Sequence, residues 1–386
     1  MQTNNFEYLS KSDLNNKVVI VRANLDVPVE NIQQGDETRF YSVIKTINFL
    51  LQRNCKVIIL SHFGEKLGEH NDSYSLMDVR FILSKLIGKQ LKFANAKQCL
   101  NSIKYMHHGE VLLIENLYFH PEEFSGTEED QKNFLEPFLN LGEIFVHEAF
   151  GINDEEFASI KLLKNKLPTY YGFHFEEEVK VAKFMSQDNL RPFTLILGGK
   201  FSTHKFSILE KMSKHVNKVI FGGEFGIAYL AARDIKTGKS KFATEEIELL
   251  SQLDKTLIQK GIDVSVPIDH ICINDEGKIV ELETQQIEEN FKAIDIGPKT
   301  LVLFREIIEA SQKIFWYGPM GMYEDEKSNK GTEAIGEYIA LSTPKDAFKV
   351  AGGTSTSLAI TLLKIKHKRF DHITNNPLKF VEFFNE

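Results

Sequence analysis

Polar and charged side chains follow each of four short apolar runs in the first half of the chain. The runs are Val18–Val21, Val57–Leu60, Val111–Ile114 and Ile144–Val146, and the polar segments after them are Arg22–Asp26, Ser61–Gly64, Glu115–Glu123 and His147–Gly151. Taken singly, such groups are more often helix caps or solvated turns. In a parallel sheet, however, strand ends share an edge at which ligands bind. We therefore expect these side chains to converge on a small-molecule site.

Glycines take the corresponding places in the second half. Gly198–Gly199, Gly222–Gly223, Gly318 and Gly352–Gly353 each follow a further apolar run. Glycine lets backbone approach a flat base or a phosphate, although loops also use glycine without any ligand. Lys200 and Lys205, just past the first pair, have the charge to meet phosphate oxygens. We predict a nucleotide site, and the absence of G-x-x-x-x-G-K-[ST], and of G-x-G-x-x-G after the first strand, argues against a P-loop or a classical dinucleotide fold.

The elements that must position these groups are visible in the apolar pattern. In the second half the runs are Thr194–Leu197, Val219–Phe221, Val264–Val266, Ile314–Trp316 and Phe348–Val350. Near-continuous β-branched runs are typical of parallel strands that are covered on both faces. Helical spacing lies between the runs, as in Val43, Ile47 and Leu50. The alternation predicts an α/β fold with two doubly wound parallel-sheet, Rossmann-like domains.

The two sets of runs predict the domain organisation. We expect a first domain at 1–173, a linking helix at 174–190, a second domain with the predicted nucleotide site at 191–370 and a tail helix at 371–386. The assignment of the linking helix depends on the charged helical pattern Glu176–Asp188, which ends at Pro192 before the next apolar run.

Composition narrows the class of protein. A chain of 386 residues with a formal charge of −8 suggests two domains and argues against a nucleic-acid partner. No apolar run reaches 18 residues, and the N-terminus lacks the pattern of a signal peptide, so we expect no membrane partner and a cytoplasmic location. Cys55, Cys99 and Cys272 are widely spaced, which favours reduced packing thiols over a disulfide framework or a metal site. We also expect a monomer.

Six segments carry a resemblance to the phosphoglycerate kinase family over nearly the whole chain. They read VRANLDVP, SHFGEKLG, LLIENLYFHPEE, RPFTLILGGKFSTHKF, DIGPKT and WYGPMGMYEDEKSNKGT, in the order and spacing of that family. The resemblance implies that the first domain, 1–173, is the acceptor-substrate domain, which binds 3-phosphoglycerate, and that the second binds Mg-ATP or Mg-ADP. It also implies that the linking helix is a hinge, which closes to transfer a phosphoryl group to the acceptor carboxylate.

The resemblance also assigns residues to these sites. The implied catalytic residues are Arg39, Lys200 and Lys205, and no metal ligand is implied. Either Lys200 or Lys205 can match the family's phosphate-binding lysine, depending on where a gap is placed. The implied substrate-binding positions are Asn24, Leu25, Asp26, Arg39, His62, Phe63, Gly64, Glu65, Tyr118 and Glu155. The implied nucleotide-binding positions are Gly198, Gly199, Lys200, Lys205, Gly222, Gly223, Tyr317, Glu324, Gly352, Gly353, Thr354 and Ser355.

Several of these positions depart from the family pattern. Glu65, Tyr118 and Glu155 stand where the family has arginines, Tyr317 replaces an asparagine, and Thr354 replaces an acid that helps to hold Mg-nucleotide. Asn24 and Asp26 hold the family's acid and amide in swapped order. A hydrogen bond to a charged group contributes about 1.5–3 kcal/mol, so losing three arginines removes roughly 4–9 kcal/mol of anion binding.

Three functions remain open. The first is a degenerate family member in which phosphoryl transfer from ATP to 3-phosphoglycerate, the glycolytic reaction, is weakened or lost. The second is an active kinase with rearranged contacts or a different, less anionic carboxylate. The third is a non-catalytic interaction protein, for which the 30 phenylalanines and 11 tyrosines leave room, although aromatic residues are more often buried in a core.

Overall fold

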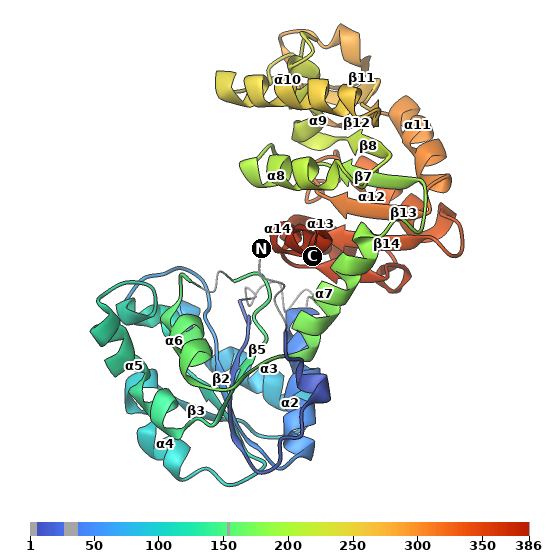
Figure 1. Cartoon of the computed structure of the whole chain (residues 1–386). Coiled ribbons are helices and arrows are strands. Elements are labelled where there is room, and N and C mark those ends of the chain that lie inside the picture. Colours follow the sequence, from blue (N-terminus) through green and yellow to red (C-terminus); the bar gives the residue numbers. More distant parts are fainter. Residues whose placement is uncertain (1–5, 27–37, 153–154, 386) are drawn as a thin grey trace. The chain divides into compact units, whose positions relative to one another are not determined.

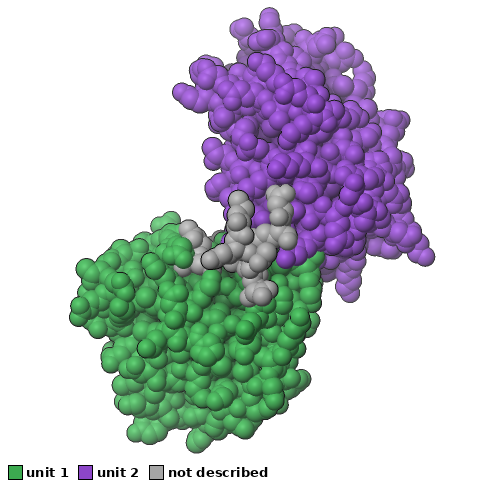
Figure 2. Space-filling view, viewed as in Figure 1, with its two compact units in different colours: residues 1–180 green, residues 181–386 purple. Residues whose placement is uncertain are grey.

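The computed structural model describes residues 6–26, 38–152 and 155–385 of the chain (Figure 1). These form two compact units, divided between Lys180 and Val181 (Figure 2). Helix α7 (Phe173–Ser186) crosses this division. Its first turn is anchored in the first unit, where the buried Glu148 carboxylate accepts a hydrogen bond from the Phe175 amide at 3.2 Å.

The first unit is built on a six-stranded parallel sheet in the order β3-β4-β2-β1-β5-β6. The strands are β1 (Val18–Arg22), β2 (Lys56–Leu60), β3 (Lys92–Ala94), β4 (Val111–Ile114), β5 (Ile144–His147) and β6 (Thr169–Tyr171). The helices between them are α2 (Thr38–Gln52), α3 (Met77–Ile87), α4 (Leu100–Lys104), α5 (Glu128–Leu141) and α6 (Ala158–Lys166). Helices α2 and α3 cover one face of the sheet, and α4, α5 and α6 cover the other (Figure 1).

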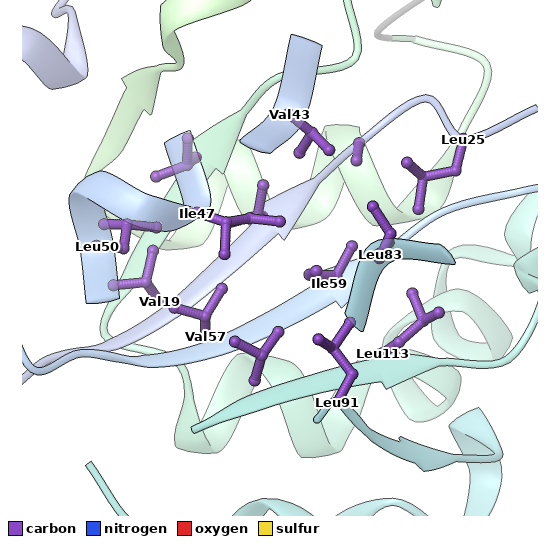
Figure 3. Packing of buried hydrophobic residues seen from close by; sticks show 14 of the residues in the cluster. Val19, Leu25, Val43, Ile47, Leu50, Val57, Ile59, Leu83, Leu91 and Leu113 are labelled. Atoms are coloured by element: carbon purple, nitrogen blue, oxygen red, sulfur yellow. The ribbon is translucent and has the colours of Figure 1, made fainter. Parts of the chain in front are cut away.

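Alternation along the strands explains why both faces are covered. Val19 and Val21 pack with Val43 and Ile47 of α2, as Figure 3 shows for this face. Ile20, between them in sequence, packs instead into the cluster that contains residues of α4, α5 and α6. Successive side chains of a strand point to opposite faces, so a continuous apolar run buries both.

The second unit repeats the plan with a parallel sheet in the order β15-β14-β13-β7-β8-β9. Its strands are β7 (Phe193–Leu197), β8 (Lys218–Phe221), β9 (Asp263–Ser265), β13 (Lys313–Tyr317), β14 (Phe348–Gly352) and β15 (His372–Thr374). Its helices are α8 (Thr203–Met212), α9 (Gly223–Ala231), α10 (Thr244–Gln259), α11 (Pro298–Glu309), α12 (Lys330–Glu337), α13 (Thr354–Leu362) and α14 (Pro377–Glu382). All nine predicted apolar runs overlap strands, and the α/β doubly wound prediction is confirmed.

Two features of the second unit differ from expectation. A three-stranded antiparallel sheet, β10 (Asp269–Asn274), β11 (Ile279–Glu283) and β12 (Phe291–Ile296), stands apart from the parallel sheet and is absent from the sequence prediction. The tail expected to be a helix holds α14 but also β15, which pairs with β14 and forms an edge of the parallel sheet. Among the described residues, no helix is long and apolar enough to cross a membrane.

Candidate functional site

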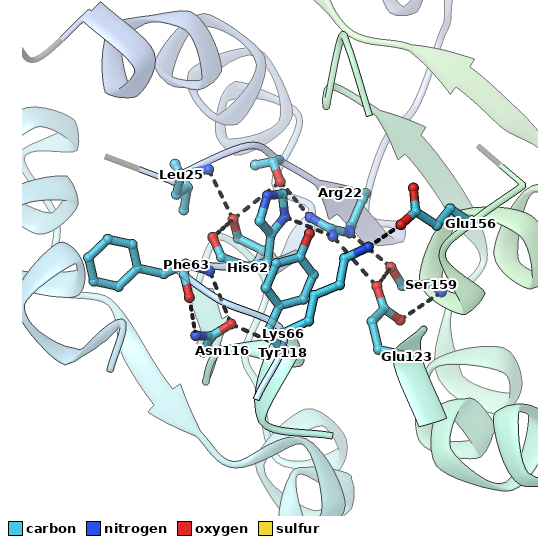
Figure 4. A network of polar contacts seen from close by, with 12 residues as sticks. Arg22, Leu25, His62, Phe63, Lys66, Asn116, Tyr118, Glu123, Glu156 and Ser159 are labelled. Atoms are coloured by element: carbon cyan, nitrogen blue, oxygen red, sulfur yellow. Dashed lines mark hydrogen bonds and ion pairs between the residues drawn. The ribbon is translucent and has the colours of Figure 1, made fainter. Parts of the chain in front are cut away.

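Arg22, the last residue of β1, is fully buried at the strand-end edge of the first unit. Its Nε donates to Ser159 Oγ at 2.8 Å, and one terminal nitrogen donates to the Ala23 carbonyl at 2.7 Å. The other lies 3.5 Å from Glu123 Oε1, in an ion pair that is also fully buried. Figure 4 shows Arg22 surrounded by these partners. The guanidinium therefore links β1 to α6 and to the short helix η5 (Pro121–Glu123) and has little capacity left for a substrate anion.

His62 is held in an uncharged form by the same arginine. Its Nδ1 lies 3.1 Å from a terminal nitrogen of Arg22. Because a guanidinium only donates hydrogen bonds, Nδ1 must accept, and the ring proton sits on Nε2. His62 is therefore a neutral donor at this edge and adds no positive charge toward an anion.

Tyr118 fills the position at which the sequence comparison expected an arginine. Its ring stacks on His62 with centroids 4.5 Å apart and an interplanar angle of 25°, and lies 5.7 Å from the Phe157 ring. The side chain is buried, and burial raises the pKa of its phenol to about 12. The aromatic stack of His62, Tyr118 and Phe157 is thus uncharged where phosphate recognition would need cations.

Among the side chains that the structure describes, the other charges of this edge are paired or negative. The Lys66 ammonium forms an ion pair with Glu156 and lies 4.7 Å from the Phe157 ring centroid. Glu65 and Glu155 are both exposed, and Glu155 lies 3.8 Å from Lys161. His120, a possible substitute cation, is buried, and burial lowers its pKa. His147 is fully buried as well.

The segments after β1 and β2 hold each other in place. Asp26 Oδ1 accepts from the Gly64 amide at 2.9 Å, and Asn24 Oδ1 accepts from the Asp26 amide at 3.3 Å. Gly64 has φ of +72°, and a Cβ there would lie 2.2 Å from the Tyr74 ring, so only glycine fits. Asp26, the acid whose place is swapped with Asn24, therefore stabilises the loop that contains Gly64.

Among the predicted substrate residues, Leu25 and Phe63 have side chains that point away from the site, and the side chain of Arg39 lies outside the described residues. The side chains of Leu25 and Phe63 are packed in the hydrophobic core, so any substrate contact would have to come from their backbone. The expectation that these two positions contact the substrate stays a prediction. The Arg39 side chain lies outside the described residues, although its backbone belongs to α2.

The second unit contains a pocket of about 850 Å³, which we call the second-unit pocket. Of the predicted nucleotide residues it brings together Gly199, Lys200, Lys205, Gly223, Tyr317, Glu324, Thr354 and Ser355. Gly198, Gly222, Gly352 and Gly353 are not among its lining residues. A Cβ on Gly198 would lie 2.2 Å from the Pro319 carbonyl oxygen, and one on Gly222 would lie 2.3 Å from Met320 Sδ. These two glycines are therefore required by the packing of one loop against another.

Lys205 is the buried lysine of the pocket, with 8% of its surface exposed. Its Nζ donates to the carbonyls of Gly198 at 2.7 Å and Lys200 at 2.6 Å, and lies 5.2 Å from the centroid of the Tyr317 ring. Burial lowers its pKa to about 8. The Lys200 side chain is exposed. Both lysines line the pocket, and Lys205 is the one fixed at its glycine loop.

The loop after β13 reaches α13 through the Gly318 amide, which donates to Thr356 Oγ1 at 2.8 Å. Tyr323, Glu324 and Ser355 all line the pocket, and burial raises the pKa of the Tyr323 phenol to about 12. Thr354 and Ser355 form the first turn of α13, where free amides and the helix dipole favour negative charge. Lys205 and this helix terminus give the pocket two features suited to phosphate.

Several further lining residues were missed from the sequence, among them the charged or titratable Lys239, Lys241, His270, Lys292 and Asp295. Three of them lie on β10 and β12, whose mixed polar pattern did not predict strands. Asp295 belongs to the DIGPKT segment of the family resemblance, but the resemblance assigned it no role. Its carboxylate accepts from the Gly331 amide at 2.7 Å and the Ile296 amide at 2.9 Å, and burial raises its pKa to about 7.

Known proteins resemble the chain along its whole length. A family model described as phosphoglycerate kinase matches residues 9–385. Phosphoglycerate kinase of Elusimicrobium minutum is 30% identical, covering 99% of this chain and 96% of its own, and that of Leptospira biflexa is 31% identical, covering 97% and 94%. The solved phosphoglycerate kinase from Coxiella burnetii superposes with a TM-score of 0.81 at 25% identity, covering 98% of this chain and 96% of its own. The one from Pyrococcus horikoshii gives 0.81 at 24% identity, with 99% and 96% covered.

Proposed function

The chain belongs to the phosphoglycerate kinase family, and we propose that it retains nucleotide binding while phosphoryl transfer to 3-phosphoglycerate is weakened or lost. The observation that carries the proposal is the buried stack of Tyr118 on His62, which replaces a cation by an uncharged ring. Membership of the family supports the substrate class, and the replaced residues support the loss.

The second-unit pocket supports nucleotide binding. Lys205 lies beside the carbonyls of its glycine loop, and the first turn of α13 offers free amides. Both features suit the phosphates of ATP or ADP. Thr354 gives a neutral hydroxyl where the family resemblance expects an acid, and the described residues contain no group of three or more His, Cys, Asp or Glu suited to a metal ion. Mg²⁺ would therefore enter mainly as the nucleotide's own counterion.

The strand-end edge of the first unit supports a weakened acceptor site. Phosphoryl transfer consists mostly of positioning and charge neutralisation. Among the described side chains, Arg22 and Lys66 form ion pairs with Glu123 and Glu156, and the exposed Glu65 carboxylate repels an anion. An absent charged contact costs about 1.5–3 kcal/mol, so three lost contacts lower the affinity by roughly 10³- to 10⁶-fold.

A coupled assay with ATP and 3-phosphoglycerate tests the proposal. Active kinases of this kind turn over at about 1–100 per second, and we expect a rate at least about 100-fold below that range. Turnover inside the range would refute the loss. A relative with all three arginines, assayed in parallel, is the control for the coupling enzymes.

A second function is favoured by one observation. The aromatic stack of His62, Tyr118 and Phe157 would suit a less anionic carboxylate with an apolar body. Trapping acyl phosphates with hydroxylamine across a panel of carboxylic acids would detect such a kinase. If no acid in the panel gives a hydroxamate above the no-acid blank, this alternative fails.

The remaining expectations form part of the proposal. We propose that α7 is the hinge between an acceptor-binding first unit and a nucleotide-binding second unit, since it crosses their division. We also propose a monomer in the cytoplasm, which the three free, buried cysteines support. A third role, as a pure interaction protein, would be favoured only if neither nucleotide nor acceptor binds.

A further inference from the structure

The segment between Asp78 and Glu110 differs in charge from the rest of the chain. It holds six lysines and arginines and no aspartate or glutamate, although the whole chain has 54 acidic residues and a formal charge of −8. The segment contains most of helix α3, the edge strand β3 and helix α4. The overall charge argues against a general nucleic-acid binder, but a cluster of one sign creates its own local field. This part of the first unit is therefore positively charged on an otherwise acidic protein.

Two hollows lie along this segment, and cations line both. The first, of about 350 Å³, is at the C-terminal end of α3, and we call it the α3 hollow. The second, of about 450 Å³, is lined by β3 and α4, and we call it the α4 hollow. The lining of the α3 hollow includes Arg80, Phe81, Lys85 and Lys89, and that of the α4 hollow includes Lys92, Phe93 and Tyr105. Among the residues that the structure describes, no acidic side chain lines either hollow.

Each hollow has an aromatic ring that is open to solvent. Phe81 is 59% exposed, and Tyr105 is 76% exposed, the largest fraction of any large hydrophobic side chain that the structure describes. The Arg80 guanidinium lies 4.4 Å from the centroid of the Phe81 ring and 5.8 Å from that of Phe93, so the two hollows are neighbours. Single exposed apolar residues are ordinary, and so are surface lysines. The combination of open rings and cations in both hollows, without an acid, points to a ligand.

The cations of the two hollows can still meet an anion. Arg80 and Lys85 form no ion pair with any other described residue. The Lys89 ammonium donates to the Gly109 carbonyl at 2.6 Å, which leaves its charge unneutralised. Lys92 lies 2.6 Å from Glu110, but this pair is at the surface, where an ion pair contributes little and a ligand can replace it.

A chain that alternates bases with phosphates matches this surface. Proteins that bind single-stranded nucleic acid combine a positively charged groove with aromatic side chains on which successive bases stack. Each hollow offers an exposed ring and at least one cation, so neighbouring nucleotides can place a base on each ring and a phosphate beside each cation. A duplex hides the faces of its bases and a polyphosphate has no bases, so neither can use the rings.

We propose that the α3 and α4 hollows form a binding surface for single-stranded nucleic acid, in which bases stack on Phe81 and Tyr105 and phosphates meet the lining cations. This inference goes beyond the proposed function and does not depend on it. Both hollows belong to the first unit, and they share no lining residue with the second-unit pocket.

Fluorescence anisotropy on the full chain gives the test, with labelled oligouridylate and oligothymidylate of about 12 nucleotides as probes. We expect at least one strand to bind with a Kd of about 10⁻⁶–10⁻⁴ M at about 0.15 M salt, the range of sequence-independent binding. Contacts of the four lining cations with phosphates predict that the logarithm of the association constant falls with the logarithm of salt concentration at a slope of about −3. A duplex of equal length and inorganic polyphosphate should bind at least about tenfold more weakly, because neither offers free base faces.

Removal of the rings tests the stacking. The double variant Phe81→Ala and Tyr105→Ala should weaken binding of the single strand about 10- to 100-fold and leave the salt slope unchanged. Tyr41→Ala is the matched control, because Tyr41 is 57% exposed on α2, outside both hollows, and it should leave the affinity unchanged. Thermal unfolding identifies any variant that fails to fold, and the wild-type comparison of strand, duplex and polyphosphate stands without the variants.

Reversal of charge tests the phosphate contacts. The double variant Lys85→Glu and Lys89→Glu should make the salt slope shallower by about 1.4, which corresponds to two lost contacts. Lys161→Glu with Lys166→Glu makes the same change in net charge at exposed positions of α6, and it should leave the slope unchanged.

Several outcomes would overturn the inference while leaving the proposed function intact. One is the absence of binding of either strand up to about 1 mM. Another is equally tight binding of duplex or polyphosphate, which would make the surface a general polyanion site. Displacement of the strand by saturating Mg-ATP would place it in the second-unit pocket, and full affinity in the ring variant would show that Phe81 and Tyr105 bind no base.

Discussion

The two units have the same plan, a six-stranded parallel sheet with functional groups at its strand ends, but they use their charges differently. In the first unit, Arg22 and Lys66 form ion pairs with Glu123 and Glu156. In the second, Lys200, Lys241 and Lys292 line a pocket and form no ion pair with any other described residue. The difference teaches that a scaffold can persist while the capacity to bind an anion changes, because that capacity depends on which cations are left unpaired.

The largest expected change comes from reversing charge at the first unit. In the double variant Glu65→Arg and Glu155→Arg, two exposed carboxylates become guanidinium groups. We expect the affinity for 3-phosphoglycerate to rise by roughly 10²- to 10⁴-fold, since repulsion is removed and bidentate donors are added. Calorimetry at fixed ionic strength measures it.

The control for this prediction carries the same change in net charge elsewhere. Glu129→Arg and Glu136→Arg, both exposed on α5, should leave 3-phosphoglycerate affinity nearly unchanged. A comparable gain in this control would mean that general electrostatics, and no local site, governs binding.

The next effect concerns the stability of the first unit. Arg22→Met leaves Glu123 as an unpaired buried carboxylate, and we expect the free energy of unfolding to fall by about 3–5 kcal/mol. Urea denaturation measures this loss. The double variant Arg22→Met and Glu123→Leu removes both charges and should be more stable than the single variant. If Arg22→Met were neutral in stability but changed ligand binding, Arg22 would be a substrate residue.

Lys205 provides the corresponding test in the second unit. Lys205→Ala should weaken ATP binding by roughly 10- to 100-fold, because a charged hydrogen-bond donor to phosphate is lost. Lys200→Ala, at an exposed position, should have the smaller effect. An equal or reversed order would give the phosphate-binding role to Lys200.

The same lysine predicts a pH dependence of nucleotide binding. The Lys205 pKa of about 8 means that its charge is present below pH 8 and is lost as the pH rises through that value. Wild-type affinity for ATP should therefore fall above about pH 8, with a slope of up to tenfold per pH unit. Lys205→Arg stays charged and should show a flat profile over the same range.

The smallest expected change is at Tyr118. Tyr118→Phe keeps the ring stacked on His62 and removes only the hydroxyl. We expect the free energy of unfolding to shift by less than about 0.5 kcal/mol and the 3-phosphoglycerate affinity to stay within about twofold. A large loss of affinity would show that the phenol has taken over an anion contact from the arginine.

The sequence predicted the parallel sheets well because their strands are continuous apolar runs that are easy to recognise. Runs such as Val18–Val21 are apolar on both faces, and β1 is covered by helices on both sides. Strands β10 to β12 were missed because their burial is incomplete and mixed: Ile279–Glu283 alternates exposed and half-buried residues, and Phe291–Ile296 mixes buried and exposed ones. Their pairing is antiparallel, with β10 and β11 joined by the short segment 275–278 and β12 added on the other side of β10.

The candidate sites were predicted less completely than the fold. The glycine loop and Lys205 followed from spacing, but spacing could not separate Gly199, which lines the pocket, from Gly198, which packs against Pro319. Leu25 and Phe63 carried motif positions, yet their side chains lie in the core. His270, which lines the second-unit pocket, lies in none of the motifs, so nothing in the sequence indicated a place for it there.

The most direct measurement of the central claim is calorimetric titration of one preparation with ATP and with 3-phosphoglycerate under the same conditions. The account predicts saturable binding of ATP with Mg²⁺ at a Kd below about 1 mM, and no saturation by 3-phosphoglycerate up to about 10 mM. Tight binding of 3-phosphoglycerate, with a Kd similar to that of ATP, would contradict the difference between the two units on which the proposed function rests.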